Sequence, residues 1–403
     1  MAVMEDLPSS LSTLSIDEAD ESAWEAVVIG AGPAGAMAAR ELARRGMQVL
    51  LVERKAFPRV KVCGACLNQR AVSWLELAGL GELLPRLGAI PTTRFTAICG
   101  GRSVDIELPG GAAVSRESLD GALVQAAIDS GAQFLSGVSA TLMDDRVDPA
   151  ERKVELAAPG RRQQKIQARL VLAADGLGRP SLLQSREFVT RISPAAKIGV
   201  RASIEGGSDR FAPGAIYMAV GRSGYAGVVR VEDGSLNLAA AIAPDALKCA
   251  GSAEAAVATI LTEAGLPEVE LPVAGAWRGT LPLSRQTTRP VGRRVFVLGD
   301  AAGYVEPFTG EGIAWALGSG MAVASIAERG LRHWSGEVEQ EWLTTYRRLV
   351  RDRQLWCRGF AALLRRPALA RLAVQIASAW PALCRPVVCS LNRPVRPLEI
   401  ACS

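Results

Sequence analysis

The sequence predicts an α/β protein that carries an inserted antiparallel β-sheet and a helical C-terminal region. Three observations lead to this class. Residues 24–53 follow a strand–glycine turn–helix–strand pattern, which is the start of a parallel, Rossmann-like sheet. Residues 186–285 alternate apolar and polar positions between turn signals, as antiparallel strands do. Residues from 336 onward have helical periodicity, with arginines placed among Leu, Ala and Trp.

The first unit carries a nucleotide-binding fingerprint. An apolar strand over 26–29 leads into glycines at G-x-G-x-x-G spacing, a helix over 34–45 ends at Gly46, and a second strand closes on Glu53. In such a unit the glycines permit a tight turn, the approach of a pyrophosphate and close helix–strand packing, and the acid accepts a hydrogen bond from a ribose. The residues assigned to this site are Gly30, Gly32, Pro33, Ala34, Gly35, Glu53 and Arg54.

The composition limits the chemistry that this chain can perform. Its 403 residues are 49% hydrophobic, and a net charge of +5 is too small for a nucleic-acid footprint. Eight irregularly spaced cysteines without a secretory leader indicate a reducing, cytoplasmic compartment. The one histidine, His333, lies in a polar stretch and is predicted at the surface. We therefore expect no metal, and we expect a cofactor to supply the reactive chemistry.

Two segments bear on membranes and secretion. Residues 1–23 are polar and acidic, lack the features of a signal peptide and predict a mobile tail. No run reaches the roughly 20 apolar residues that a membrane span requires. The closest run, Leu372–Cys384, contains Pro381 and lies between two arginines. We expect it either to be buried in the protein or to lie on a membrane surface as a peripheral contact.

Two further strand–turn segments follow the fingerprint. One apolar strand runs into Asp175-Gly176, and another ends at Gly299-Asp300 before the loop PFTGEGI and a long helix of small residues. With GAGPAG, these segments make the chain similar to the FAD-dependent oxidoreductases built like the aromatic hydroxylases and the geranylgeranyl reductases. The segments FPRVKVCGACL and SRESLD also resemble this family, and the motifs together span residues 26 to about 320.

The resemblance implies FAD as the cofactor and NAD(P)H as a transiently docked reductant. Asp300 would bind the ribityl or ribose hydroxyls of FAD, and Asp175 would stand near the pyrophosphate. Arg116 would contact the phosphates or the ribityl chain, unless it is only a helix-start residue beside a Ser115 cap. Lys61 is either a cofactor or reductant contact or a solvated charge.

The PFTGEGI loop is expected beside the pyrimidine side of the flavin ring. A helix that begins near Gly310–Ile313 would direct unpaired N–H groups at the negative charge that a reduced flavin develops there. Gly310 and Gly312 would let the backbone come close and are assigned a catalytic role, and Pro307 would stiffen the approach.

The two cysteines of KVCGACL are expected to act separately. Their C-x-x-C spacing is compatible with a redox dithiol or half of a metal site, but no second pair or nearby histidine completes a zinc site. The resemblance places Cys63 and Gly64 beside the flavin, with Cys63 facing the ring or the substrate in a catalytic position. Cys66, one helical turn on, is expected to be a small core residue.

These patterns predict four parts of the chain. They are a tail (1–23), a discontinuous FAD-binding domain (24–90, 112–185 and 286–335), a substrate-binding β-sheet domain (91–111 and 186–285) and a C-terminal helical region (336–403). The helical region is expected either to pack over the other parts or to form a lipophilic lid at a membrane surface.

The reaction stays open between two classes, both on a lipophilic or aromatic small molecule. One is a monooxygenase, and the other is a reductase that transfers a hydride to an alkene; PFTGEGI and FPRVKVCG are closer to the geranylgeranyl reductases. The absence of W-x-W-x-I-P disfavours a flavin halogenase. A prenyl-lipid binding protein of the GDP-dissociation-inhibitor type is the non-catalytic alternative. Further pocket residues, equally explained as packing or surface charge, are Tyr217, Tyr225, Arg201, Arg230 and Glu306.

Overall fold

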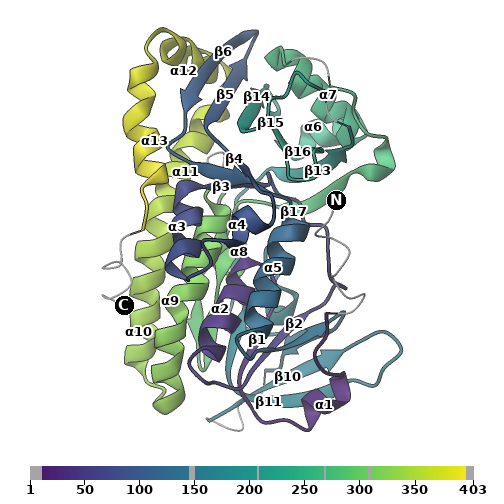
Figure 1. The fold of residues 1–403 in the computed structure, drawn as a ribbon, viewed down its shortest axis with the longest axis vertical. Coiled ribbons are helices and arrows are strands. Elements are labelled where there is room, and N and C mark those ends of the chain that lie inside the picture. Colours follow the sequence, from purple (N-terminus) through teal and green to yellow (C-terminus); the bar gives the residue numbers. More distant parts are fainter. Residues whose placement is uncertain (1–10, 145–149, 207, 267–268, 307–309, 396–403) are drawn as a thin grey trace.

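The computed structural model describes residues 11–144, 150–206, 208–266, 269–306 and 310–395 (Figure 1). Two large sheets lie one above the other along the long axis of the molecule in Figure 1, and the C-terminal helices run beside both. The fold is therefore the predicted α/β class with an inserted second sheet.

The first sheet is parallel at its centre. Its central strands, in spatial order, are β20 (Val295–Val297), β11 (Gln164–Ala173), β1 (Trp24–Ile29), β2 (Val49–Glu53) and β8 (Gln133–Ser136). Antiparallel strands complete it: β19 (Val291–Gly292), β9 (Ser139–Leu142) and β10 (Arg152–Ala157). Strands β1, β2, β20 and the second half of β11 consist mainly of buried apolar residues, as strands covered by helices do. The carboxyl ends of the parallel strands meet at one edge, where ligands bind in open α/β sheets.

Helices α2 (Pro33–Ala43), α5 (Arg116–Ile128) and α9 (Gly312–Arg332) pack beside this sheet. The turn from β1 into α2 needs glycine, because Gly30 has φ +102° and a Cβ on Gly35 would lie 1.8 Å from the Gly30 carbonyl oxygen. Helix α9 also approaches the backbone of α2 closely, since a Cβ on Gly320 would lie 2.4 Å from the Ala34 carbonyl oxygen. Small residues thus let the two helices pack backbone to backbone.

The second sheet has the order β17-β13-β16-β15-β14-β5-β6. Its strands are β17 (Arg278–Pro282), β13 (Ile198–Ile204), β16 (Leu236–Ile242), β15 (Gly224–Arg230), β14 (Ala215–Val220), β5 (Arg94–Cys99) and β6 (Arg102–Glu107). Residues 94–107 join it as predicted, but β5 pairs with β14 in parallel, so the expectation of a wholly antiparallel sheet is wrong at this pair. The chain enters β5 from a distant segment, and no tight hairpin imposes an antiparallel direction.

Helices cover both faces of the second sheet. On one face lie α6 (Pro244–Ala250) and α7 (Ala253–Ala264), whose Val257 and Ile260 join the sheet core. On the other face Ala370 and Val374 of a C-terminal helix pack against strand residues. The second sheet is therefore packed between α6 and α7 on one face and a C-terminal helix on the other.

Two small sheets and short helices complete the connections. The small sheets are β3 (Cys66–Asn68), β7 (Gly111–Ala113) and β4 (Ile90–Pro91), and β12 (Thr190–Ile192), β18 (Arg285–Thr287) and β21 (Gly303–Tyr304). The short helices are α3 (Gln69–Leu77), α4 (Leu83–Arg86), η1 (Pro180–Leu182), η2 (Ala274–Ala276) and α8 (Gly299–Ala302).

The C-terminal region is helical, as predicted. It comprises α10 (Gly336–Tyr346), a π-helical turn η3 (Arg347–Arg351), α11 (Asp352–Leu364), α12 (Pro367–Ala379), η4 (Pro381–Cys384) and α13 (Arg385–Asn392). Pro367 occupies the first turn of α12 and separates it from α11. Among the described residues no single helix is long and apolar enough to cross a membrane; Pro367–Ala379 and Pro381–Asn392 pass that test only as a pair bent by 116°.

The N-terminal segment corrects the prediction of a mobile tail over 1–23. Residues 11–23 contain α1 (Ile16–Asp20), which Ser15 and Glu18 close with a capping box. Ile16 and Ala19 are buried, and the Trp24 indole nitrogen donates to the Ala19 carbonyl oxygen at 2.8 Å. The S-x-x-E spacing was a signal for this helix; residues 1–10 lie outside the described part.

Candidate functional site

A cavity of about 1040 Å³ lies between the carboxyl edge of the first sheet, the second sheet and the C-terminal helices. This volume is at the upper end of the roughly 300–1,000 Å³ of small-molecule pockets, so the cavity has room for a large ligand. Most predicted site residues line it: Gly30, Gly32, Pro33, Ala34, Glu53, Arg54, Lys61, Cys63, Gly64, Arg116, Asp175, Gly299, Asp300, Gly310, Gly312 and Ile313. Gly35 instead packs helix against strand, and Pro307 lies outside the described residues.

The N-terminus of α2 forms an anion site with two arginines. A Cβ on Gly32 would lie 3.7 Å from a guanidinium nitrogen of Arg59 and equally far from one of Arg116. The first turn of α2 adds unpaired N–H groups and the positive end of the helix dipole. A diphosphate is the kind of ligand that this arrangement suits.

Both arginines are held by one buried carboxylate. Asp120 accepts from Arg116 at 2.8 Å through each of its oxygens, and from Arg59 at 2.8 Å. Glu53 makes a second ion pair with Arg59 at 3.1 Å. Burial lowers the pKa of Arg116, but the Asp120 carboxylate outweighs burial and raises it. The two guanidinium groups are thus fixed, charged parts of the wall.

Arg59 and Asp120 were missed from the sequence, and each carried a weak signal. Asp120 stands four residues after Arg116 on the same helix face, which is the spacing of an ion pair. Arg59 lies within the quoted segment FPRVKVCGACL, two residues before Lys61. Arg116 follows the Ser115 cap at the start of α5 and also lines the cavity, so its place at the helix start does not prevent contact with a ligand.

Two side chains on the wall ionise near neutral pH. Burial, together with the neighbouring positive charge of Arg59, lowers the pKa of Lys61 to about 8. Burial also raises the pKa of Asp300, in the first turn of α8, to about 6, against the opposing effects of Arg116 and Lys61. Perturbed groups of opposite type in one cavity are typical of a functional site.

Two more carboxylates lie on the lining. Asp175 accepts from the backbone N–H of Ser181 at 2.8 Å through Oδ2, while its buried Oδ1 has no hydrogen-bond partner among the described residues. Glu53 accepts from the backbone N–H groups of Ala31 (3.2 Å) and Lys55 (3.1 Å). Each carboxylate oxygen can accept more than one bond, so both groups have acceptor capacity left for ligand hydroxyls.

The N-terminus of α9 also reaches the cavity. Gly310 has φ +70°, buried Glu311 is the N-cap, and Gly312 begins the helix, as predicted. Burial raises the pKa of Glu311, while Arg353 of α11 opposes this by donating to it at 2.5 and 3.0 Å. Arg353 also donates to the Leu391 carbonyl oxygen of α13 at 3.0 Å, so the start of α9 is tied to the last helices.

The cysteine pair corrects one expectation. Cys66 lies in strand β3, not one helical turn beyond Cys63, and its partly exposed side chain lines the cavity as that of Cys63 does. Between them Ala65 has φ 57°, the left-handed region. Burial raises the pKa of the Cys66 thiol, and the Cys63 side chain hydrogen-bonds to Arg116. In the described parts of the chain no three His, Cys, Asp or Glu side chains group as metal ligands.

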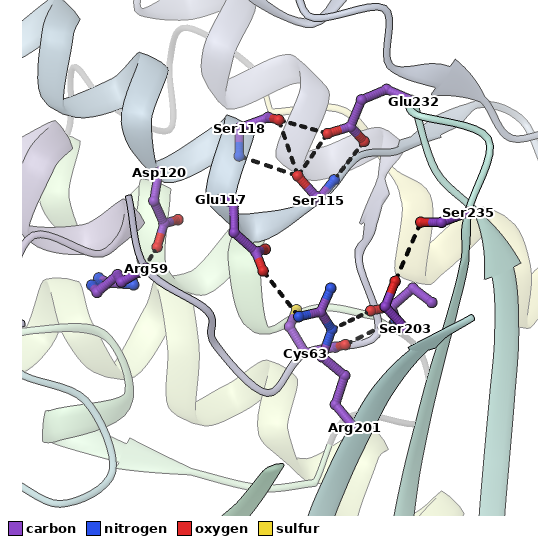
Figure 2. A network of polar contacts seen from close by, with 11 residues as sticks. Arg59, Cys63, Ser115, Glu117, Ser118, Asp120, Arg201, Ser203, Glu232 and Ser235 are labelled. Carbon is purple, nitrogen blue, oxygen red and sulfur yellow. Dashed lines mark hydrogen bonds and ion pairs between the residues drawn. The ribbon is translucent and has the colours of Figure 1, made fainter. Parts of the chain in front are cut away.

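Figure 2 shows how the second sheet holds these elements in place. Glu232, in the turn after β15, accepts from the Ser115 and Ser118 hydroxyls at 2.6 Å each and so fixes the start of α5. Arg201 of β13 pairs with Glu117 at 3.0 Å. The same arginine donates to Asn237 at 2.6 Å, and Asn237 donates to the Cys63 carbonyl oxygen at 3.1 Å. Arg116 and Cys63 are therefore positioned from the inserted sheet.

The half of the cavity beneath the second sheet and the C-terminal helices is largely aliphatic. Its lining includes Phe95, Ile106, Leu108, Ile216, Met218, Val228, Val229, Leu283, Phe360, Ile376, Leu383, Val387, Val388 and Leu391. Of the further pocket residues predicted, Tyr225 lines it; Tyr217, Arg201, Arg230 and Glu306 do not. Arg230 bonds to backbone carbonyls, and buried Glu306 pairs with Lys197 at 2.7 Å.

The residues on the polar half fit FAD. The anion site suits its diphosphate, and the carboxylates of Glu53 and Asp300 and the free Asp175 oxygen are acceptors suited to its hydroxyls. The N-terminus of α9 lines the same cavity and carries unpaired N–H groups.

Comparisons with known proteins agree with this geometry. Residues 23–354 match the family described as FAD binding domain. Menaquinone reductase of Mycobacterium tuberculosis H37Rv is 30% identical over 330 residues, 77% of each chain. Digeranylgeranylglycerophospholipid reductase 1 of Methanopyrus kandleri is 30% identical over 320 residues, 75% of this chain and 80% of that protein. The structure of the flavin-dependent brominase Bmp2 aligns with TM-score 0.77 at 16% identity, over 92% of this chain and 94% of that one, which shows a shared fold.

Proposed function

This chain belongs to the FAD binding domain family, and from that premise we propose that it is an FAD-dependent reductase of an isoprenoid lipid. The reaction would saturate a carbon–carbon double bond of the lipid's polyprenyl chain. It would consume NAD(P)H as the hydride donor and one proton from water. The two 30%-identical relatives, named for reductases of menaquinone and of a geranylgeranylated phospholipid, support this substrate class.

The observation that carries the proposal is the aliphatic half of the cavity. On the walls formed by the second sheet and the C-terminal helices, the ionisable residues are Tyr225, Arg278 and Cys384 among the described residues. A substrate recognised through a phenolate or carboxylate would need a fixed cationic partner in that half, whereas Arg278 is exposed and donates to the backbone carbonyl oxygens of Gly275 and Trp277. A branched hydrocarbon chain needs only apolar contact surface, which this half supplies.

The protein's own residues would bind and orient the reactants. We assign the FAD diphosphate to Gly32, Arg59 and Arg116, and the hydroxyls of FAD to Glu53 and Asp300. Bound FAD supplies hydride transfer. The N-terminus of α9, at Gly312, would stabilise negative charge at the ring edge through its unpaired N–H groups.

Two hydroxyl groups on the cavity wall keep their protons at neutral pH. Burial raises the pKa of Tyr225 and of Tyr304 well above the ordinary value. Both side chains line the cavity. As protonated hydroxyls they can donate a hydrogen bond to a lipid head group, or pass on the proton that the second alkene carbon receives.

The decisive experiment uses the purified holoprotein, NADH or NADPH, and detergent-dispersed menaquinone or digeranylgeranylglycerophospholipid. Mass spectrometry should show a product that has gained two hydrogens, both without O2 and under isotopically labelled O2. Incorporation of labelled oxygen would replace the reductase proposal with a monooxygenase. A purified protein that takes up no FAD would favour the non-catalytic lipid binder. Bromination or chlorination of an added phenol would overturn the expectation against a halogenase.

A matched pair of variants tests the substrate half. Ala373 lines the cavity from α12, so Ala373→Phe should keep the flavin absorbance but lower lipid turnover at least ten-fold. Ala368 is exposed on the same helix, and Ala368→Phe should leave turnover within two-fold of the parent protein. Equal turnover in the two variants would contradict the assignment of this half to the substrate.

A further inference from the structure

The outer face of the C-terminal helices carries a stripe of exposed apolar side chains. Leu369, Leu372 and Ile376 of α12, with Trp380 and Leu383 beyond it, are 39–64% exposed. The first four follow the spacing i, i+3, i+7, i+11, so they lie along one side of the helix. We call these five residues the α12 stripe. Figure 1 places α12 and α13 at the outer edge of the molecule.

The stripe is not the face that holds α12 to the protein. Ala370 and Val374 are the buried residues of this helix, and they pack against the second sheet. The helix therefore has two apolar faces, one inside the protein and one outside. Single exposed apolar residues are ordinary, but a periodic row of large ones along a helix indicates an interaction surface.

Positive charge surrounds the stripe. Residues 353–395 contain arginines but no aspartate or glutamate. Arg365 and Arg366 precede α12, Arg371 lies within it and Arg385 begins α13, and all four are exposed. Basic residues around an apolar helix face are attracted to anionic lipid head groups, and arginine stems can pack along the hydrocarbon boundary while their charges stay in water. Pairing with a second copy through this face would bring like charges together, which is unfavourable.

The stripe also adjoins the cavity. Ile376 and Leu383 belong to both the exposed stripe and the cavity lining, where Ala373, Val387 and Val388 accompany them. The aliphatic half of the cavity therefore reaches the surface between α12 and η4. The helices on either side of this point are bent by 116°, so α12 can lie along a membrane surface without crossing it.

We propose that the α12 stripe docks on an anionic bilayer, seating its apolar side chains at the boundary of head groups and acyl chains. A lipid then enters the aliphatic half of the cavity between α12 and η4 without crossing water. The docking proposal is supported by the α12 stripe and the arginines around it. The entry route in addition depends on the proposed reductase function.

The test is flotation of the FAD-loaded protein with vesicles of phosphatidylcholine alone or with added phosphatidylglycerol. The parent protein should bind the anionic vesicles at least ten-fold more tightly, and added salt should weaken this binding. The variant Leu372→Gln/Trp380→Gln changes two stripe residues outside the cavity lining and should reduce binding at least ten-fold. Arg365→Gln/Arg366→Gln should reduce both the binding and its salt dependence.

The matched control places the same change on exposed apolar residues elsewhere. Leu183 and Val273 are 76% and 77% exposed, and Leu183→Gln/Val273→Gln should bind vesicles as the parent does. Equal binding by the stripe and control variants would overturn the proposal. The proposal would also be overturned by a different pair of results. In that case light scattering would show a dimer that the stripe variant dissociates, and no protein would float with the vesicles. Turnover of detergent-dispersed lipid separates the two proposals, because it reports on the reductase and not on docking.

Discussion

Lys61 lies among the charges that surround the anion site at Gly32. Asp120 raises the pKa of the neighbouring Arg116, whereas burial and the charge of Arg59 bring the pKa of Lys61 down to about 8. An anionic diphosphate nearby would favour protonated Lys61 and raise this pKa. Cofactor binding should therefore be linked to one proton on this side chain.

We predict that the contribution of Lys61 to FAD affinity is constant below about pH 8 and then falls by up to ten-fold per pH unit. Titration of the apoprotein with FAD between pH 6 and 10, followed by flavin fluorescence, measures this profile. Lys61→Met should remove the decline, and Lys61→Arg should keep the tight binding at pH 10. A decline that persists in Lys61→Met would assign the proton to another group.

As the pH rises above 8, Lys61 affects the stability of the apoprotein in the opposite direction to its effect on FAD affinity. Because the pKa of Lys61 is lowered from 10.5 to about 8, the unfolded chain holds this proton to higher pH than the folded apoprotein does. Lys61 therefore makes folding less favourable below about pH 8, and the apoprotein gains stability from it as the pH rises from 8 towards 10.5.

Cys63 and Cys66 are predicted to differ in function although both line the cavity. Cys63 hydrogen-bonds to Arg116, and its carbonyl oxygen accepts from Asn237, so Cys63→Ser should keep FAD bound and change the turnover number several-fold. Burial keeps the Cys66 thiol neutral, so Cys66→Ala should change turnover less than two-fold. Steady-state kinetics with each variant decides this, and an equal loss in both would restore the dithiol interpretation.

At the scale of elements, the contact of α2 with α9 joins the anion site to the helix that starts at Gly312. The two backbones approach so closely at Gly320 and Ala34 that no side chain fits between them. Ala34 belongs to the first turn of α2 and lines the cavity, so displacement of α9 would change the cofactor site. The packing of α9 against α2 therefore helps to shape the cavity wall at Ala34.

We predict that Gly320→Ala destabilises the protein by about 1–3 kcal/mol, because its Cβ would overlap the Ala34 carbonyl oxygen. Denaturant unfolding of the holoprotein measures this loss, and FAD titration should show weaker binding. Gly359→Ala in α11 is the matched control: a Cβ there meets nothing within 4 Å, so removing a helical glycine should stabilise by about 0.5–1 kcal/mol. A neutral result at both positions would contradict the tight α2–α9 contact.

The C-terminal helices also contact the start of α9, which lines the cavity. Arg353 joins buried Glu311, at the start of α9, to the backbone of α13. Arg353 therefore connects the helix that begins at Gly312 with the helix that follows the α12 stripe. The sequence motifs end near residue 320, yet the wall of the site continues to Asn392.

At the scale of the whole molecule, one cavity is built from the first sheet, the second sheet and the C-terminal helices. A ligand that fills it contacts all three. FAD in the polar half should stabilise the folded protein by about 2.7 kcal/mol when free FAD is at one hundred times its Kd.

We predict that removing FAD lowers the melting temperature by several degrees, and that adding it back restores the original value. Differential scanning calorimetry of holoprotein, apoprotein and reconstituted protein measures this. AMP at the same concentration is the control, since it lacks the flavin and ribityl parts. Equal melting temperatures for apoprotein and holoprotein would mean that the cavity is not the FAD site.

The sequence by itself determined the features that depend on near neighbours in the chain. The turn at Gly30, the close packing of Gly35, the start of α9 at Gly312 and the alternation of the second sheet follow from local spacing, backbone sterics and side-chain period. The glycine geometry indicated a dinucleotide site, and the resemblance of GAGPAG, the Asp175 segment and the Gly299-Asp300 loop to a flavoprotein family indicated FAD.

Only the tertiary structure decided which distant residues meet. It brought Arg59 and Asp120 to Arg116, placed Cys66 in a strand, paired β5 with β14 in parallel and set the C-terminal helices on the cavity wall. Local periodicity does not predict these long-range contacts, because they depend on the order of the strands and on which helix faces pack together. Most residues of the polar half, Arg116 included, could therefore be predicted from motifs. The contacts of Arg116 with Asp120 and of Asp120 with Arg59, and the residues of the aliphatic wall, could not.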